Sequence, residues 1–187
     1  MVLGRIGRGE VDVNNTKVQE DNIPVLRRSS GGGTVVQGPG CLNYSLILSK
    51  QKYPELNDLR KSYEWISHKV MAALREAGVD AYFRPISDLA TGQDEKKFSG
   101  NAQRRGKNYI LHHGTILYNF DLALISRYLK MPQDIPEYRK GRPHTDFVTN
   151  ISLDPPVFKD SLAKGFFAEG LQAPSAEELL ALKNFKQ

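Results

Sequence analysis

The sequence predicts a single α/β or α+β domain in which antiparallel hairpins alternate with helices. Apolar and polar side chains alternate over residues 42–48, the period of two that is typical of a β-strand. Over residues 58–77 the apolar side chains recur at helical spacing, and Gly78 supplies a stop. Residues 109–118 give a second long strand pattern, and 187 residues suffice for one hydrophobic core.

Shorter patterns predict the remaining elements. The first six residues are expected to end a strand, with polar loops over 7–22 and 131–146. Further strands are expected at 34–36, 81–84 and 147–150, and a hairpin joins 89–91 to 97–100. Helices are expected over 122–129, capped by Asp121, and near 157–169 and 175–185, the last opened by a Ser175–Glu178 capping box.

Composition narrows the classes of partner. The net charge is +5, but no run of Lys and Arg exceeds two residues, which argues against nucleic acid and suits an acidic protein or a nucleotide phosphate. No apolar stretch approaches the length of a membrane span or forms a signal peptide, so no membrane partner is expected. Cys41 is the only cysteine, which fits a reducing, cytoplasmic location and predicts a buried, inert thiol.

The segment Arg27-Arg28-Ser29-Ser30-Gly31-Gly32-Gly33-Thr34 is the first candidate binding element. Three successive glycines are costly to order, which favours a backbone that passes close to a ligand. The arginine forks, the hydroxyls and the backbone N–H groups together suit an anionic group. The segment matches neither a Walker loop nor a dinucleotide fingerprint. The alternative is a flexible hairpin tip with solvated arginines.

The segment Lys97-Phe98-Ser99-Gly100-Asn101-Ala102-Gln103 is the second. A lysine ammonium suits one carboxylate or phosphate oxygen, and a buried cation would stabilise the charge that develops when ATP activates an acid. The alternative is an exposed lysine in a charged turn.

Two adjacent histidines, His112 and His113, lie in the strand pattern of residues 109–118, so their side chains are expected on opposite faces. Gly114 follows them, and a glycine inside a strand often marks a close backbone approach. His144 is expected to contact nucleotide or partner. No histidine has a partner at metal-ligand spacing, so no protein metal site is expected.

Taken in order, four segments resemble the lipoate–protein ligases of the biotin/lipoate ligase family. They are residues 27–35, 40–45, 97–103 and 113–119, and the resemblance runs from about Val2 to Asn150. It implies a mixed β-sheet flanked by helices, similar to the core of class II tRNA synthetases.

The resemblance also implies a reaction. Lipoate and ATP, assisted by Mg²⁺, would give lipoyl-AMP, and the lipoyl group would pass to a lysine of an acceptor domain. The implied acceptors are lipoyl domains of 2-oxoacid dehydrogenase complexes or the glycine-cleavage H protein. Lys97 would hold the acyl carbonyl and the phosphate, and the leucines of 42–48 could line an apolar tunnel. The residues implied to bind substrate or adenylate are Arg28, Ser30, Gly31, Gly32, Gly33, Thr34, Gly100, Asn101, Ala102, His113 and Gly114.

The chain also departs from the family. We expect the helix and strand that usually precede Val2, and a C-terminal accessory domain, to be missing, and Gln37 stands where many relatives have histidine. We therefore expect one catalytic domain over residues 1–187 that works with a separate accessory subunit. A related branch transfers octanoyl groups from acyl carrier protein without ATP, using a cysteine after the His-Gly-Thr strand, which is absent here. An ATP-independent octanoyl or lipoyl acyltransferase and a non-catalytic lipoate- or adenylate-binding module remain the alternatives.

Overall fold

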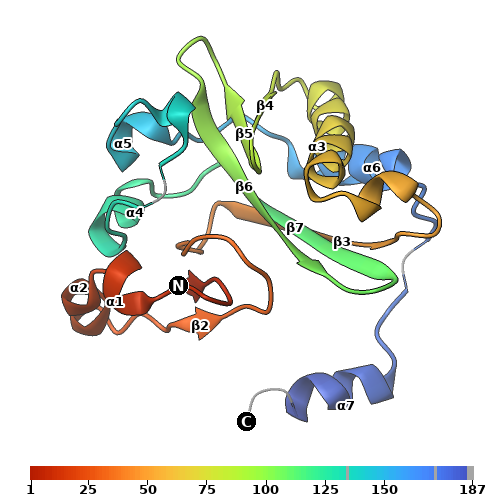
Figure 1. Ribbon diagram of the computed structural model, residues 1–187, viewed down its shortest axis with the longest axis horizontal. Helices are drawn as coiled ribbons and strands as arrows, with labels where there is room; N and C mark the ends of the chain where they lie inside the picture. The colour runs from red at the N-terminus through yellow and green to blue at the C-terminus, as the bar shows by residue number, and fades with distance from the viewer. Residues whose placement is uncertain (134, 171, 185–187) are drawn as a thin grey trace.

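A computed structural model describes residues 1–133, 135–170 and 172–184. Its centre is an antiparallel five-stranded sheet in the order β3-β7-β6-β5-β4 (Figure 1). The strands are β3 (Cys41–Ser49), β4 (Tyr82–Arg84), β5 (Asp88–Thr91), β6 (Lys96–Arg105) and β7 (Tyr109–Leu117). A small parallel sheet pairs β1 (Val2–Leu3) with β2 (Leu26–Arg27).

Helices lie on both sides of the large sheet. On one side are α3 (Leu59–Glu76) and α6 (Pro155–Gly165); on the other are the small sheet, α1 (Gly9–Asp12), α2 (Asn15–Glu20), α4 (Ala123–Tyr128) and α5 (His144–Phe147) (Figure 1). Two 3₁₀ turns are η1 (Pro54–Asn57) and η2 (Glu137–Arg139), and α7 (Ala176–Asn184) follows at the C-terminal end. We call the side covered by α3 and α6 the α3 face, and the opposite side the loop face.

The main hydrophobic core fills the α3 face. Asp58 caps α3 by accepting a hydrogen bond from the Lys61 backbone N–H at 2.8 Å, and the helix buries Ile66 and Val70 completely. These side chains pack with Leu48 and Leu89 of the sheet and with Phe158 of α6. A second cluster lies on the loop face, where Leu3 of β1, Val13, Phe120 and Phe147 are buried together.

Polar groups cross the α3 face as one connected chain. His112 is fully buried, and its Nδ1 lies 3.1 Å from Gln103 Nε2. The Gln103 Oε1 accepts from Ser62 at 3.1 Å and from Arg105 at 2.8 Å. The Gln103 amide therefore donates to Nδ1, and the imidazole hydrogen sits on Nε2. Arg105 also donates to the Leu56 carbonyl at 2.5 Å, which fastens η1 to the sheet.

Long periodic patterns gave the correct elements: β3, α3, β7 and the β5–β6 hairpin lie where the sequence predicts them. The Ser175–Glu178 capping box is also confirmed, by hydrogen bonds of 2.7 and 3.2 Å. α6 begins at Pro155 and ends at Gly165, earlier than expected, and residue 185 of the last expected helix lies outside the described residues.

Short elements were predicted less well. Residues 7–22 are not a loop, because α1 and α2 form there and bury Val13 and Val18; neither helix is long enough to show a periodic pattern. The expected loop over 131–146 likewise contains η2 and most of α5.

Two expected strands shrink to single bridges. In 34–36 only Val35 pairs, with Val2, and in 147–150 only Val148 pairs, with Lys97. The second segment cannot continue as a strand because Phe147 ends α5 and the Asn150 side chain bonds to the backbone of Phe120.

The buried face of α3 should dominate stability. Ile66→Ala removes a fully buried side chain and should lower the free energy of unfolding by about 2–5 kcal/mol. Ile47→Ala is the matched control, because Ile47 is 76% exposed on β3 and should change it by less than about 0.5 kcal/mol. Urea unfolding measures both, and equal losses would contradict this account of the core.

His112 should make stability depend on pH. Burial, and secondarily His113, lowers the pKa of His112 from 6.5 to about 3. Between these values the unfolded chain binds a proton that the folded protein does not, so stability falls as pH drops below 6.5, by at most about 1.4 kcal/mol per pH unit. Urea unfolding from about pH 7 to pH 5 should show a smaller slope in His112→Gln. The exposed-site control His68→Gln should keep the wild-type slope; an unchanged slope in His112→Gln would refute the assignment.

Candidate active site

A β-bulge in β6 decides where the candidate lysine lies. Ala90 of β5 pairs with Lys97 and Leu89 pairs with Ser99, so Phe98 is an extra residue in β6. Phe98 turns into the core of the α3 face and is fully buried. Lys97 therefore shares the loop face with Gly100, three residues on, whereas regular alternation would place them on opposite faces.

Gly100 leaves the space that the Lys97 side chain occupies. A Cβ at position 100 would lie 3.2 Å from Lys97 Nζ and 3.3 Å from Cε. The Lys97 ammonium also lies 2.7 Å from Asp88 Oδ1, at the start of β5. The Lys97 side chain keeps 29% exposure, whereas that of Asp88 keeps 11%. The Lys97 ammonium is therefore held in a defined position by Asp88 and by the space above Gly100, and is not a solvated turn residue.

The glycine loop, residues 28–34, lies over the same face. A Cβ on Gly32 would lie 3.6 Å from the Cβ of Ala102, which faces the loop from β6. Gly32 has a φ of 82°, a conformation that favours glycine. The loop also touches the N-terminal segment, since a Cβ on Gly4 would lie only 2.0 Å from the Gly32 carbonyl oxygen.

The two arginines before the glycines brace the loop. Arg28 donates to the carbonyls of Gly31 at 2.6 Å and Gly33 at 2.7 Å, and burial lowers the pKa of its guanidinium. Arg27 donates to the carbonyls of Gly4 and Gly7, both at 2.9 Å. The loop is a braced structure, not the flexible hairpin tip considered as the alternative.

Ser30 and His113 join the loop to the sheet. Ser30 is 2% exposed, and its Oγ lies 2.6 Å from His113 Nε2 on β7. Burial, and the nearby positive charge of Arg28, lower the pKa of His113, so this imidazole is held neutral. The two adjacent histidines do face opposite sides of the sheet, with His112 in the core and His113 at the loop.

Three expected binding residues lie elsewhere. Asn101 and Gly114 are on the α3 face, where the Tyr44 hydroxyl donates to Asn101 Oδ1 at 2.5 Å. A Cβ on Gly114 would lie 1.9 Å from that same oxygen, so this glycine serves the close approach of core side chains. Thr34 donates to Asp12 of α1 at 2.8 Å. The structure therefore groups Lys97, Gly100, Ala102, His113, Ser30 and the glycines, and separates these three.

Other groups on the loop face were not among the expected site residues. Gln37 donates to the Thr115 hydroxyl at 2.8 Å, and Thr115 donates to Asn43 at 2.6 Å. Asp88 and Tyr138 flank Lys97, with the Tyr138 hydroxyl 2.8 Å from Asp88 Oδ2. The available signal was Asp88 itself, a carboxylate beside the apolar pair Leu89-Ala90 in an expected hairpin, because a buried acid needs a partner.

Residues considered for other roles have ordinary positions. Leu42, Leu46 and Leu48 belong to the core of the α3 face and do not line the loop face. Cys41 is half-buried at the start of β3, and burial raises the pKa of its thiol, which suits an inert cysteine. His144 lies within 3.3 Å of Arg139 and of the Lys130 carbonyl.

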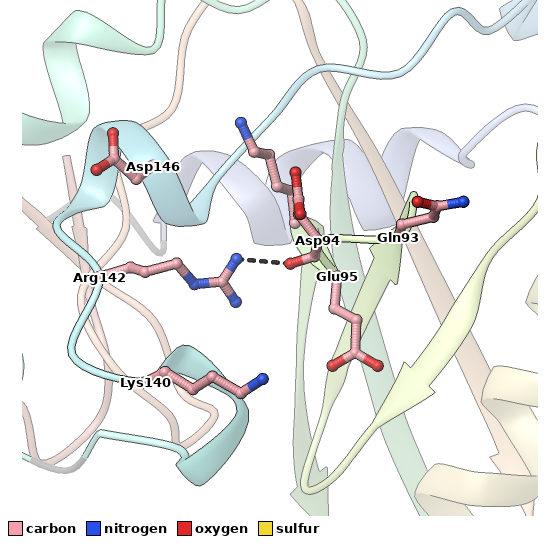
Figure 2. Close-up of a pocket in the computed structure, with 7 residues that line it drawn as sticks. Gln93, Asp94, Glu95, Lys140, Arg142 and Asp146 are labelled. Carbon is pink, nitrogen blue, oxygen red and sulfur yellow. Dashed lines mark hydrogen bonds between the residues drawn. The ribbon is translucent and has the colours of Figure 1, made fainter.

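A polar hollow of about 560 Å³ lies beside the β5–β6 turn, and no residue of the glycine loop lines it (Figure 2). Its lining mixes both signs of charge: Gln93, Asp94, Glu95, Lys96, Lys140, Arg142 and Asp146. Figure 2 shows Arg142 reaching across it to the Asp94 carbonyl, at 2.6 Å. Lys97 is not among its lining residues.

Within the described ranges, no group of three or more His, Cys, Asp or Glu side chains could hold a metal ion. Among the same residues, no helix is both long and apolar enough to cross a bilayer.

Sequence comparison finds relatives of this chain. A candidate lipoate-protein ligase A of Schizosaccharomyces pombe is 31% identical over 132 residues, which are 71% of this chain and 34% of the relative. A second candidate, from Mycoplasma pneumoniae, is 34% identical over 131 residues, 70% of this chain and 37% of the relative. The chain thus spans about a third of the length of these curated relatives.

Solved structures share the fold. A chain from the bipartite lipoate protein ligase of Thermoplasma acidophilum, studied with its E2 lipoyl domain, matches with a TM-score of 0.79 at 24% identity, over 100% of this chain and 75% of that one. A lipoate-protein ligase A bound with ATP matches with a TM-score of 0.74 at 25% identity, over 100% and 77%. The family model of the lipoyl protein ligase A/B catalytic domain matches residues 1–167. The chain therefore belongs to the lipoyl protein ligase A/B catalytic domain family.

Proposed function

We propose that this chain is the catalytic part of a lipoate–protein ligase, which activates lipoate with ATP and transfers the lipoyl group to a lysine of an acceptor domain. One observation carries the proposal: the β6 bulge brings the Lys97 ammonium onto the face that the braced glycine loop covers. A cation beside a loop of backbone donors suits a bound acyl-adenylate, which carries one anionic phosphate next to a carbonyl.

In the proposed first step, a carboxylate oxygen of lipoate attacks the α-phosphorus of ATP. The new P–O bond forms as the bond to the β-phosphate oxygen breaks, and pyrophosphate leaves. Negative charge accumulates on the α-phosphate oxygens, where Lys97 and the glycine-loop N–H groups would stabilise it more than in the bound substrates. Arg28 would act by holding the loop, since its donors already meet loop carbonyls.

In the proposed second step, the amine of the acceptor lysine attacks the carbonyl carbon of lipoyl-AMP. The amide C–N bond forms, AMP leaves with the electrons of the C–O bond, and the nitrogen releases its proton to solvent. The same cation and loop would stabilise the carbonyl oxygen as it becomes negative.

Mg²⁺ would enter with the ATP. The described residues form no carboxylate cluster for it, and Asp88 is already shared by Lys97 and Tyr138. Mg²⁺ usually binds nucleotide phosphates and keeps several waters, so we assign it to the substrate as Mg-ATP.

The proposed partners are lipoyl-acceptor domains, either of 2-oxoacid dehydrogenase complexes or the glycine-cleavage H protein. Because the chain spans about a third of its curated relatives, we propose that a further segment or accessory subunit completes the ligase. The free thiol of Cys41 suits the reducing cytoplasm.

Lys97→Ala tests the proposal. With lipoate, Mg-ATP and purified protein, lipoate-dependent pyrophosphate release should fall by about 100-fold or more, because the cation at the developing charge is lost. Lys96→Ala is the matched control: it removes the adjacent ammonium, which lines the polar hollow, and should stay within about twofold of wild type.

Two results would overturn it. Undiminished release in folded Lys97→Ala would remove the lysine from the mechanism. Transfer from an acylated carrier protein without ATP would favour the acyltransferase instead, and tight lipoate binding without turnover, even with an accessory subunit, would favour the binding module.

A further inference from the structure

Asp88 has both of its carboxylate oxygens engaged beside the candidate lysine. Oδ1 lies 2.7 Å from the Lys97 ammonium, and Oδ2 accepts from the Tyr138 hydroxyl at 2.8 Å. Asp88 is 8% exposed, and it pairs in register with Gly100, the residue whose missing Cβ makes room for Lys97. A buried acid is stable in such a place only with partners of this kind.

Tyr138 is itself firmly held. Its ring packs on Phe147 with centroids 5.1 Å apart, and its carbonyl accepts from Arg142 at 2.9 Å. Burial, and the adjacent Asp88 carboxylate, raise the pKa of Tyr138, so its hydroxyl stays protonated and donates. The chain that follows Tyr138 also bonds to β6, because Thr149 donates its N–H to the Lys97 carbonyl at 2.9 Å.

We propose that Asp88, oriented by Tyr138, is a positioning residue that holds the Lys97 ammonium over Gly100 on the loop face, ready for the anionic oxygen of the substrate. This inference rests on the proposed function and deepens it. A lysine ends in a compact charge on a flexible four-carbon stem, so its placement needs an external partner. Asp88 supplies that partner before any ligand arrives.

The arrangement has two opposed consequences. By fixing the ammonium, Asp88 favours the geometry of the reaction, where a small misplacement is costly. By occupying the ammonium and adding a negative charge, it weakens binding of the lipoate carboxylate in the ground state. Loss of Asp88 should therefore lower kcat without raising KM, whereas a residue needed only for folding would change stability and both constants together.

The kinetic test compares three variants by lipoate-dependent pyrophosphate release. Asp88→Asn should lower kcat by about tenfold or more, with the KM for lipoate unchanged or reduced. Tyr138→Phe removes one hydroxyl and should lower kcat by about two- to fivefold, which also covers the case of Asp88→Asn failing to fold. Asp160→Asn removes an exposed carboxylate from α6 and should match wild type. A kcat of folded Asp88→Asn within about twofold of wild type, or a raised KM with a lowered unfolding midpoint, would overturn the proposal.

A second readout does not depend on turnover. Brief acetic anhydride labelling, followed by mass spectrometry, gives the ratio of acetylation at Lys97 to that at Lys96. The ratio should rise by about threefold or more in Asp88→Asn, because the anhydride reacts with the free amine of Lys97, which the carboxylate no longer holds in an ion pair. An unchanged ratio overturns the positioning role. A raised ratio in Asp88→Asn, together with no adenylation by the wild-type protein, would support the positioning of Lys97 and refute the proposed reaction alone.

Discussion

One extra residue in β6 determines the chemistry available on the loop face. Because Phe98 is unpaired in the ladder, its ring enters the core while Lys97 turns to the opposite side of the sheet. Without the bulge, Lys97 and Gly100 would lie on opposite faces, and the ammonium would lose both its space and its carboxylate partner. The burial of Phe98 thus holds the lysine in place, so the stability of the core and the geometry of the site depend on the same residue.

The cationic side chains near the loop face have different kinds of partner. Arg28 donates to the carbonyls of Gly31 and Gly33, which fixes a loop that three glycines would otherwise leave flexible, while Arg27 holds the N-terminal segment that the loop touches. Lys97 lies on the same face of the sheet, and its partner is the carboxylate of Asp88 rather than a backbone carbonyl. The Lys97 ammonium, whose side chain is 29% exposed, can exchange its carboxylate partner for a substrate anion, whereas the hydrogen bonds of Arg28 cannot be released without loosening the loop.

Sequence patterns predicted the parts of the fold that span many residues. β3, β7 and α3 each repeat a period often enough to be recognised, and the alternation around His112 and His113 correctly separated their faces. The sequence did not predict the bulge. A bulge is defined by how β6 pairs with β5, which a local sequence pattern does not show. The resemblance implied that Asn101 binds beside Lys97, whereas the structure places the two side chains on opposite sides of the sheet. Asp88 was missed because it meets Lys97 only across the hairpin.

The α3 face of the sheet forms the core and the loop face holds the candidate site, and β7 contributes side chains to both. On its α3 face, Gly114 lets Asn101 and Tyr44 approach within hydrogen-bond distance, while burial keeps His112 neutral. On its loop face, the adjacent His113 meets Ser30 beneath the glycine loop. A side chain at position 114 would push the strand away from the core and so move His113. The motif His-His-Gly-Thr therefore acts on both faces of the sheet. Gly114 lies on the α3 face, out of reach of a substrate bound at the loop face, yet it keeps the neighbouring His113 in place.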